Sequence, residues 1–377
     1  MTPAGCGGLA LPAPVGKWPV GLRQLSFYDD AEQTPLSLTL FYPAQPGSAG
    51  PAAPYAFAEA LEGWGVMPDT ACIQDAPVAK DGPFPLVAYS HGYLTFAMCN
   101  SVLCADLASC GYIVAAIGHT GEAWVRLPDG AVLPKEQKYL DYVYEPAALE
   151  KAGRLIDQIA QTPRGPEYTE ELRRLAQQFY ALHDGNLNDR ADVWQRRTGD
   201  AVRYLQGLSV KEGFLCGALD LSRGVGVTGH SFGGATAANC CAGSDLFCCG
   251  VDIDGAQLGG SFGCDVKKPF LTIGAPDTCA ALRDLFLRNT ADSFLASVAG
   301  VEHMGFTDKG MIGRLAGRDY DGIGRKDPFA VREIMTDLHT RFFARYLRGQ
   351  DVEMAAPDDQ DVELRAKYAK KGGETAC

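Results

Sequence analysis

Basic residues and long apolar runs are both scarce in this sequence of 377 residues. The 34 Lys and Arg residues are outnumbered by 46 Asp and Glu residues, which leaves a net charge of -12. This balance argues against nucleic acid or a strongly anionic membrane surface as a partner, because both attract basic proteins. No apolar run approaches the roughly 20 residues that cross a bilayer. We therefore expect a soluble protein.

Metal-ligand spacings are absent as well. The 13 cysteines include the vicinal pairs Cys240-Cys241 and Cys248-Cys249, but none forms the C-x-x-C pattern of a zinc or redox site. Most lie in apolar segments, where a free thiol behaves as a small hydrophobic side chain. We expect free thiols in a reducing compartment, with disulfides between the two pairs as the alternative. We expect no metal and no other cofactor.

A leader sequence is a third missing feature. Residues 1–20 contain neither a basic segment nor an apolar stretch of the length found in secretory signals, which favours a cytoplasmic protein. Ala4-Gly5-Cys6 resembles the end of a bacterial lipoprotein signal. A secreted or periplasmic location is therefore the alternative, if a preceding signal segment has been removed.

The sequence does contain an alternation of apolar strands and helices. Residues 22–28 and 36–42 alternate apolar and polar side chains and predict an antiparallel hairpin. Residues 84–89 and 113–117 are continuously apolar, and the segment between them has helical spacing. Strands that are apolar on both faces and joined by a helix indicate a parallel sheet covered by helices.

The remaining segments extend this plan. We expect an irregular excursion over residues 55–80 and a mostly helical region over residues 146–208. That region lies between two sheet strands, so it forms either a partial cap over a site or an ordinary crossover. Three further strands and a last helix are predicted at residues 248–253, 269–273, 294–298 and 329–347.

The strongest motif is Gly229-His230-Ser231-Phe232-Gly233. A β-rich run over residues 225–228 precedes it and small helix-forming residues follow it, as a strand–turn–helix elbow requires. Such a turn holds the serine in a strained conformation and leaves its hydroxyl free at the end of a strand. We interpret Ser231 as a nucleophile. The alternative, a glycine-rich loop with an ordinary surface serine, is disfavoured by the flanking strand and helix.

A serine hydroxyl needs a base within hydrogen-bond reach, and histidine is the usual one. His303 follows the last predicted strand, as the order serine, acid, histidine of α/β-hydrolases requires, so we predict it as the base. The other histidines are less suitable as the base. We expect His230 to point away from the nucleophile, His91 to shape an earlier loop, and His339 to occupy a surface or core-edge place on the last helix.

Two aspartates could orient this histidine and stabilise its protonated form. Asp254 ends the strand after the elbow, and Asp277 follows the next strand. The acid commonly comes after the later strand in this fold, which favours Asp277, but the residues alone leave both open. For the oxyanion hole we predict the backbone N–H groups of Phe232, which follows the nucleophile, and of Tyr93, which follows an earlier strand.

Several stretches resemble the α/β-hydrolase family of platelet-activating factor acetylhydrolases, the plasma and type II intracellular enzymes and their bacterial relatives. The resembling stretches are PLVAYSHG (85–92), ADLASCGYIVAA (105–116), GHSFGGAT (229–236) and VEH (301–303). The opening LPAPVG (11–16) with PVG (19–21) is similar to the bacterial members. The likeness runs from about residue 11 to residue 345 and is weakest over residues 121–193.

In that family the acid follows the strand directly after the elbow, as a Leu-Asp or similar pair. Ile253-Asp254 matches this pattern and moves our prediction to Asp254, with Asp277 kept as the alternative acid. The resemblance carries the nucleophile onto Ser231 and the base onto His303, and it supports the same two oxyanion amides. It also implies a reaction that needs no calcium. The residues after Asp254 depart from the bulky residues of the animal enzymes.

The sequence thus predicts one α/β-hydrolase domain over residues 11–350, with a mostly parallel central sheet flanked by helices. A helical insertion, or partial cap, spans about residues 121–208 before the elbow, and residues 351–377 form a charged tail.

The expected activity is that of a serine esterase that cleaves short-chain carboxylic esters through an acyl-enzyme, including short-acyl phospholipids of the platelet-activating factor type. The alternatives are a broad carboxylesterase or polyester hydrolase, and a catalytically inactive binding protein that retains the fold. We expect a small-molecule or lipid ester as the partner, with weak contact to a lipid interface. The oligomeric state is left open.

Overall fold

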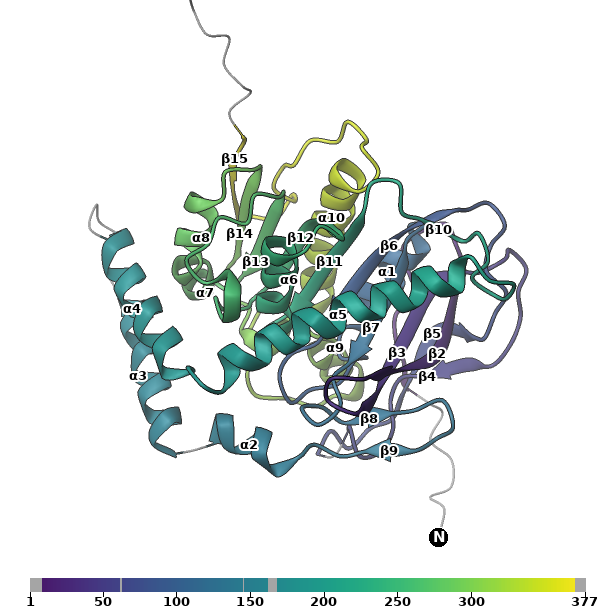
Figure 1. The fold of residues 1–377 in the computed structure, drawn as a ribbon, viewed down its shortest axis with the longest axis horizontal. Coiled ribbons are helices and arrows are strands. Elements are labelled where there is room, and N and C mark those ends of the chain that lie inside the picture. Colours follow the sequence, from purple (N-terminus) through teal and green to yellow (C-terminus); the bar gives the residue numbers. More distant parts are fainter. Residues whose placement is uncertain (1–8, 62, 145, 162–167, 370–377) are drawn as a thin grey trace, which may run out of the picture.

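The computed structural model describes residues 9–61, 63–144, 146–161 and 168–369. Ala4-Gly5-Cys6 and the end of the charged tail lie outside these residues. In the described part of the chain, thirteen strands form one sheet (Figure 1). Its main path runs through β1 (Leu9–Ala10), β5 (Pro68–Gln74), β2 (Val20–Asp29), β3 (Thr34–Pro43), β7 (Ile113–Gly118), β6 (Phe84–Ser90), β11 (Val225–His230), β12 (Phe247–Ile253), β13 (Phe270–Gly274), β14 (Ser293–Val298) and β15 (Val362–Lys367).

The middle of the sheet is parallel. Strands β7, β6, β11, β12, β13 and β14 pair in parallel, whereas β3 joins β7 and β15 joins β14 in antiparallel fashion. The predicted hairpin over residues 22–28 and 36–42 is confirmed as β2 and β3. Two short strands pair at the sides, β4 (Ala52–Pro54) with β5 and β10 (Leu219–Asp220) with β6, and β8 (Val125–Arg126) with β9 (Val132–Leu133) forms a separate hairpin. Because parallel strands end at one edge, the segments that follow them meet there.

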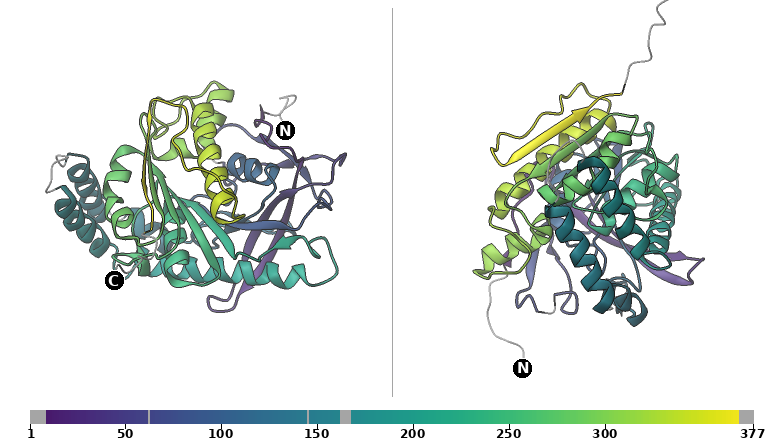
Figure 2. Two further views of the ribbon diagram at one scale, coloured as in Figure 1. Left: turned by 90° about the horizontal axis from the view of Figure 1, so that it is seen from above. Right: turned by 90° about the vertical axis from the view of Figure 1, so that its left-hand side faces the viewer.

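Helices cover both faces of this sheet (Figure 1, Figure 2). Along β6, Val87 and Tyr89 belong to one apolar core and Leu86 and Ala88 to the other, which is why the strand is apolar throughout. Helices α1 (Ser101–Ser109), α9 (Asp308–Ala316) and α10 (Pro328–Tyr346) pack on the first face. Helices α5 (Leu187–Ser209) and α6 (Phe232–Gly243) pack on the second.

The predicted helical insertion over about residues 121–208 contains α2 (Gln137–Tyr144), α3 (Pro146–Gln161), α4 (Tyr168–Leu182) and nearly all of α5. Leu155, Leu172 and Leu175 of α3 and α4 are buried against the end of α7 (Pro276–Ala281), next to α8 (Arg283–Arg288). Tyr142 and Val143 of α2 pack instead on the cluster that contains Phe232. These contacts support a partial cap, which stays a prediction. Among the described residues, none of the helices combines the length and apolarity needed to span a bilayer.

Two segments are more ordered than we predicted. The excursion over residues 55–80 contains β5, whose side chains alternate between buried and exposed. The charged tail contributes β15, in which Val362 and Leu364 pack on the core between charged neighbours. Both strands lie toward the edges of the sheet, where polar side chains are tolerated and weaken the sequence signal.

The eleven cysteines among the described residues are all free thiols. Cys240 and Cys241 are fully buried in α6, and burial raises the pKa of both thiols above its ordinary value. Both side chains therefore stay protonated and pack as small apolar groups.

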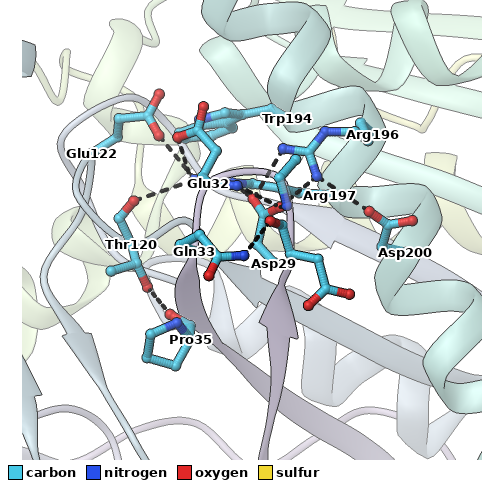
Figure 3. Close-up of polar contacts among 12 residues, drawn as sticks. Asp29, Glu32, Gln33, Pro35, Thr120, Glu122, Trp194, Arg196, Arg197 and Asp200 are labelled. Atoms are coloured by element: carbon cyan, nitrogen blue, oxygen red, sulfur yellow. Dashed lines mark hydrogen bonds and ion pairs between the residues drawn. The ribbon is translucent and has the colours of Figure 1, made fainter.

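A buried set of ion pairs fastens α5 to the sheet (Figure 3). Arg197, which is 1% exposed, donates from Nε to Asp29 Oδ2 at 2.8 Å and from Nη1 to Glu122 Oε2 at 3.0 Å. Arg190 donates to both carboxylate oxygens of Glu122, at 2.6 and 2.8 Å. It also donates to both oxygens of Glu32, at 2.9 and 3.1 Å.

Arg196 completes this arginine cluster by donating to both oxygens of Asp29, at 2.6 and 3.0 Å. Burial by itself would raise the pKa of Asp29, but the hydrogen bonds from Arg196 and Arg197 outweigh it and hold the pKa well below its usual range. Three guanidinium groups thus face three carboxylates. They join α5 to the β2–β3 turn and to the loop after β7, whose Glu122 is completely buried.

On the other face of the sheet, a second polar contact joins α1 and α9. Asp308, in the first turn of α9, accepts hydrogen bonds from the Ser101 hydroxyl at 2.8 Å and from the Val102 amide at 3.3 Å, both at the start of α1. Its own amide donates to the carbonyl of Cys99 at 2.8 Å. Burial raises the pKa of Asp308 to about 7, although these hydrogen bonds oppose the shift.

We predict that Glu122→Gln destabilises the protein strongly, because it leaves Arg190 and Arg197 buried with too little negative charge. Removing one partner of a buried pair typically costs about 3–5 kcal/mol in the free energy of unfolding. Asp75→Asn is the matched control, since Asp75 pairs with Arg23 at 2.7 Å on the surface and its loss should cost less than about 1 kcal/mol. Urea denaturation measures both. Equal, small losses would contradict the assigned role of the cluster.

A second prediction concerns pH. An acid whose pKa is higher in the folded state stabilises the fold fully below its unfolded pKa, and this contribution is lost as the pH rises through the folded value. For Asp308 the loss falls between about pH 4 and 7. Wild type should therefore lose about 2 kcal/mol more unfolding free energy than Asp308→Asn between pH 5 and pH 7. The exposed Asp81→Asn should follow wild type; parallel curves for all three proteins would refute the prediction.

Candidate active site

The elbow predicted around Ser231 lies between the end of β11 and the start of α6. Ser231 has φ 58° and ψ -118°, a conformation that side chains other than glycine rarely adopt. The strained backbone is held by a hydrogen bond from the Ser231 amide to the carbonyl of Ile253 at 2.8 Å. Gly233 is required here, because a Cβ at this position would collide with the carbonyl of Ser90. The turn thus presents the hydroxyl at the carboxyl edge of the sheet.

Three predicted side chains form one hydrogen-bonded chain. His303 Nε2 lies 2.9 Å from Ser231 Oγ, and His303 Nδ1 lies 2.6 Å from Asp254 Oδ2. The amide of Ala275 donates to the other oxygen of Asp254 at 2.8 Å. Burial favours a higher pKa for Asp254, but the hydrogen bond and charge of His303 and the Ala275 amide lower the pKa below its usual value. An ionised Asp254 keeps the proton of His303 on Nδ1, which leaves Nε2 free to accept one from the serine.

Asp277, the alternative acid, lies elsewhere. It is exposed in the first turn of α7, and no hydrogen bond joins it to His303 among the described residues. The structure therefore brings Asp254 to the histidine. The common position for this fold had favoured Asp277, and only the family resemblance pointed to Asp254.

His230 lies beside His303, a contact that we did not predict, whereas its direction away from the nucleophile stays a prediction. The two ring centroids are 4.7 Å apart, and His230 Nε2 lies 2.9 Å from the carbonyl oxygen of His303. Burial lowers the pKa of His230 to about 3, with the neighbouring His303 adding to the effect. His230 is therefore neutral at working pH, and its Nε2–H donates to that carbonyl and fixes the backbone of the base.

Two other histidines have structural roles. His91 is completely buried, and its Nδ1 lies 2.7 Å from the carbonyl of Gly92, so it shapes the loop after β6 as predicted. His339 is also completely buried, with Nε2 3.0 Å from Thr228 Oγ1, which corrects the expected surface or core-edge place. His339 is buried because α10 packs against β11. The local sequence around His339 does not reveal this packing.

The two predicted oxyanion amides come from segments that meet at the elbow. Phe232 is the first residue of α6, where the N–H groups have no partner within the helix and the helix dipole favours negative charge. Tyr93 lies in the loop of residues 91–95 after β6, and its ring packs on that of Phe232 with centroids 5.0 Å apart. A Cβ at Gly92 would lie 3.3 Å from Ser231 Cβ, so this loop closely approaches the nucleophile.

Sequence reasoning missed the residues that support the 91–95 loop from behind. Trp194 of α5 is completely buried, stacks on His119 at 3.6 Å between ring centroids and contacts the ring of Tyr93 at 6.0 Å. The backbone carbonyl of Glu122 accepts a hydrogen bond from the amide of Leu94 at 3.0 Å. The carboxylate of the same residue belongs to the arginine cluster. Trp194 carried only the signal of an apolar helix position, because its partners come from distant segments.

Taken together, the site offers a serine activated by an oriented base, with two backbone amides nearby. Such a set can carry out acyl transfer, in which a carbonyl is attacked and a negative charge develops on its oxygen. Within the described residues, no group of three or more His, Cys, Asp or Glu side chains is arranged to hold a metal ion.

Comparison with solved structures supports the fold. A ferulic acid esterase from Streptomyces cinnamoneus is similar to this chain with a TM-score of 0.69 and 23% sequence identity. The likeness covers 96% of this chain and 99% of the other. The chain has the predicted α/β-hydrolase fold, with a mostly parallel sheet flanked by helices.

Sequence comparison finds curated relatives named platelet-activating factor acetylhydrolase. The protein from Gallus gallus is 24% identical over 280 residues, which cover 70% of this chain and 62% of the relative. The protein from Cavia porcellus is 25% identical over 284 residues, which cover 72% of this chain and 60% of the relative. The chain therefore spans about 60% of the length of these relatives.

A family model described as platelet-activating factor acetylhydrolase, isoform II, matches residues 64–126 and 196–363. The two matched segments make up more than half of the chain, and they contain the elbow, both aspartates and His303. The gap between them coincides with the helical insertion, where the predicted resemblance is weakest. That resemblance is confirmed, and the chain belongs to the family of platelet-activating factor acetylhydrolase, isoform II.

Proposed function

We propose that this protein is a serine ester hydrolase. The observation that carries the proposal is the continuous hydrogen-bonded chain from Ser231 through His303 to Asp254. Its distances of 2.9 and 2.6 Å are those of a nucleophile in contact with its base and of a base oriented by a third group. A catalytically inactive binding protein would have no need to keep this alignment on a strained turn.

In the first half of the reaction, His303 Nε2 takes the proton of the Ser231 hydroxyl as Oγ attacks the ester carbonyl. The negative oxygen of the tetrahedral intermediate accepts hydrogen bonds from the amides of Tyr93 and Phe232. Loss of one such donor typically raises the barrier by about 3–4 kcal/mol. The bond to the alcohol oxygen then breaks, and that oxygen receives the proton from His303. An acyl-enzyme remains.

The second half reverses these roles with water. His303 removes a proton from a water molecule, which attacks the acyl carbonyl through a second tetrahedral intermediate. The carboxylic acid leaves and the proton returns to Ser231. Throughout, the ionised Asp254 stabilises the protonated form of His303 without accepting its proton.

We propose short-chain carboxylic esters as substrates, including short-acyl phospholipids of the platelet-activating factor type. The names of the curated relatives support the phospholipid. The large apolar side chains that are exposed in the described residues lie on separate elements, which supports only weak contact with a lipid interface and substrate taken up as monomers.

A broad-specificity carboxylesterase or polyester hydrolase is the second candidate. The observation that favours it is the exposure of His303, whose side chain is 48% accessible beside the nucleophile. An open site of this kind accepts esters of varied shape. The structural neighbour named as a ferulic acid esterase agrees with an ester outside the phospholipid class.

Hydrolysis of p-nitrophenyl acetate tests the proposed activity. We expect Ser231→Ala to lower kcat by about 10⁶-fold, since it removes the nucleophile. Asp254→Asn should lower kcat by about 10⁴-fold, because the amide favours the wrong proton arrangement on His303. The exposed Asp277→Asn is the matched control and should remain within about twofold of wild type.

Folding of each variant is checked by its thermal unfolding midpoint. Turnover that survives Ser231→Ala would contradict the assigned nucleophile. A loss at Asp277 that equals the loss at Asp254 would contradict the assigned acid.

A further inference from the structure

A cavity of about 400 Å³ is lined by residues from the segment that follows His303 and from the 91–95 loop. Met304, the residue after His303, forms part of its wall. Leu94 and Thr95, which directly follow Tyr93, form another part. The cavity therefore lies between the loop that carries the base and the loop that carries a predicted oxyanion amide. Its volume is within the range of cavities that bury small organic ligands.

The surroundings of Gly92 place this cavity close to Ser231. A Cβ at Gly92 would lie within 3.3 Å of Ser231 Cβ and 3.5 Å of Thr95 Cγ2, so the wall at Thr95 and the nucleophile flank the same glycine. Thr95 is fixed in this place, because its hydroxyl donates to the carbonyl of Gly92 at 2.7 Å. A group bound to the reacting carbonyl could extend from Ser231 into the cavity.

Aromatic side chains dominate the apolar part of the lining. Trp64 and Phe96 pack edge to face with ring centroids 6.0 Å apart, and Trp124 joins them from the segment after β7. The backbone of Trp64 is held by a hydrogen bond from the Tyr320 hydroxyl at 2.7 Å. Aromatic rings offer large, rigid surfaces that favour planar or bulky apolar groups.

The polar side chains of the lining carry charges of both signs. They are Glu59, Thr95, Lys135, Thr307 and Lys309. Because both signs are present, charge does not select one class of substrate group. The aromatic surface of the cavity selects the group instead.

The chemistry of the site indicates which half of an ester enters. The alcohol oxygen receives its proton from His303 Nε2, so the alcohol must leave on the side of the histidine. Met304 and Thr307, from the segment that follows His303, line the cavity on that side. The Thr307 hydroxyl donates to the carbonyl of Met304 at 2.6 Å, which holds this wall in shape.

We propose that this cavity binds the alcohol moiety of the ester and selects alcohols that carry an aromatic or bulky apolar group. The inference rests on the proposed function, since it requires Ser231-dependent ester hydrolysis. It assigns Trp64 and Trp124 as specificity-determining residues that contact the alcohol and take no part in proton transfer.

The test compares two pairs of esters, so that the alcohol and the acyl group are varied separately. In the alcohol series, kcat/KM for 2-phenylethyl acetate is divided by kcat/KM for propyl acetate, whose alcohol has similar acidity. In the acyl series, kcat/KM for propyl phenylacetate is divided by that for propyl acetate. Both ratios are measured for wild type, Trp124→Ala and Trp64→Leu.

We expect the alcohol ratio to exceed 10 in wild type and to fall by about tenfold in each variant, the effect of losing a hydrophobic contact in a pocket. Trp18→Ala is the matched control. Trp18 is also a half-buried tryptophan, but it packs on Phe84 at 5.8 Å between ring centroids, at the far end of β6. Its alcohol ratio should equal that of wild type.

An alcohol ratio that is unchanged in both Trp124→Ala and Trp64→Leu would overturn the inference. A fall confined to the acyl ratio would also overturn it, because the cavity would then hold the acyl group. Failure of the proposed function would look different. In that case the turnover of every ester would be independent of Ser231.

Discussion

The backbone of Ser231 is held at φ 58°, and much of the architecture around it serves to keep it there. The turn fits only because Gly233 lets α6 begin against the end of β6, where a side chain would collide with Ser90. It is fixed to β12 by the hydrogen bond between the Ser231 amide and Ile253. A strain of about 1–3 kcal/mol persists only where the surroundings determine it, and here those surroundings are the parallel strands β6, β11 and β12.

Two loops must meet this fixed serine, and each is secured from a different face of the sheet. On the face covered by α5, the arginine cluster and Trp194 hold the 91–95 loop, through the carbonyl of Glu122 and the ring of Tyr93. On the face covered by α1, the contact of Asp308 with Ser101 secures the start of α9, which directly follows the loop of His303. The reacting geometry is thus the product of two buried polar networks, although the site itself is half open to solvent.

The sequence predicted those parts of the molecule that depend on local pattern. Continuous apolar runs located β6, β7 and the strands after the elbow, and the glycines around Ser231 located the turn. The acid could not be chosen in this way, because Asp254 and Asp277 both follow strands, and only tertiary packing brings one of them to His303. The same limit explains why the contact of His230 with His303 and the burial of His339 were not predicted. Their surroundings come from segments about 70 to 110 residues away. β5 and β15 were missed because strands at or near the edge of the sheet carry polar residues that resemble those of loops.

The most direct test of the account is covalent labelling of the intact protein with an alkyl fluorophosphonate, which reacts with a serine only when a base and an oxyanion hole activate it. Mass spectrometry should find one equivalent bound to Ser231, and Asp254→Asn should slow the labelling by orders of magnitude relative to Asp277→Asn. A protein that remains unlabelled while folded, or that is labelled at another residue, would contradict the claim that this strained turn holds an activated nucleophile.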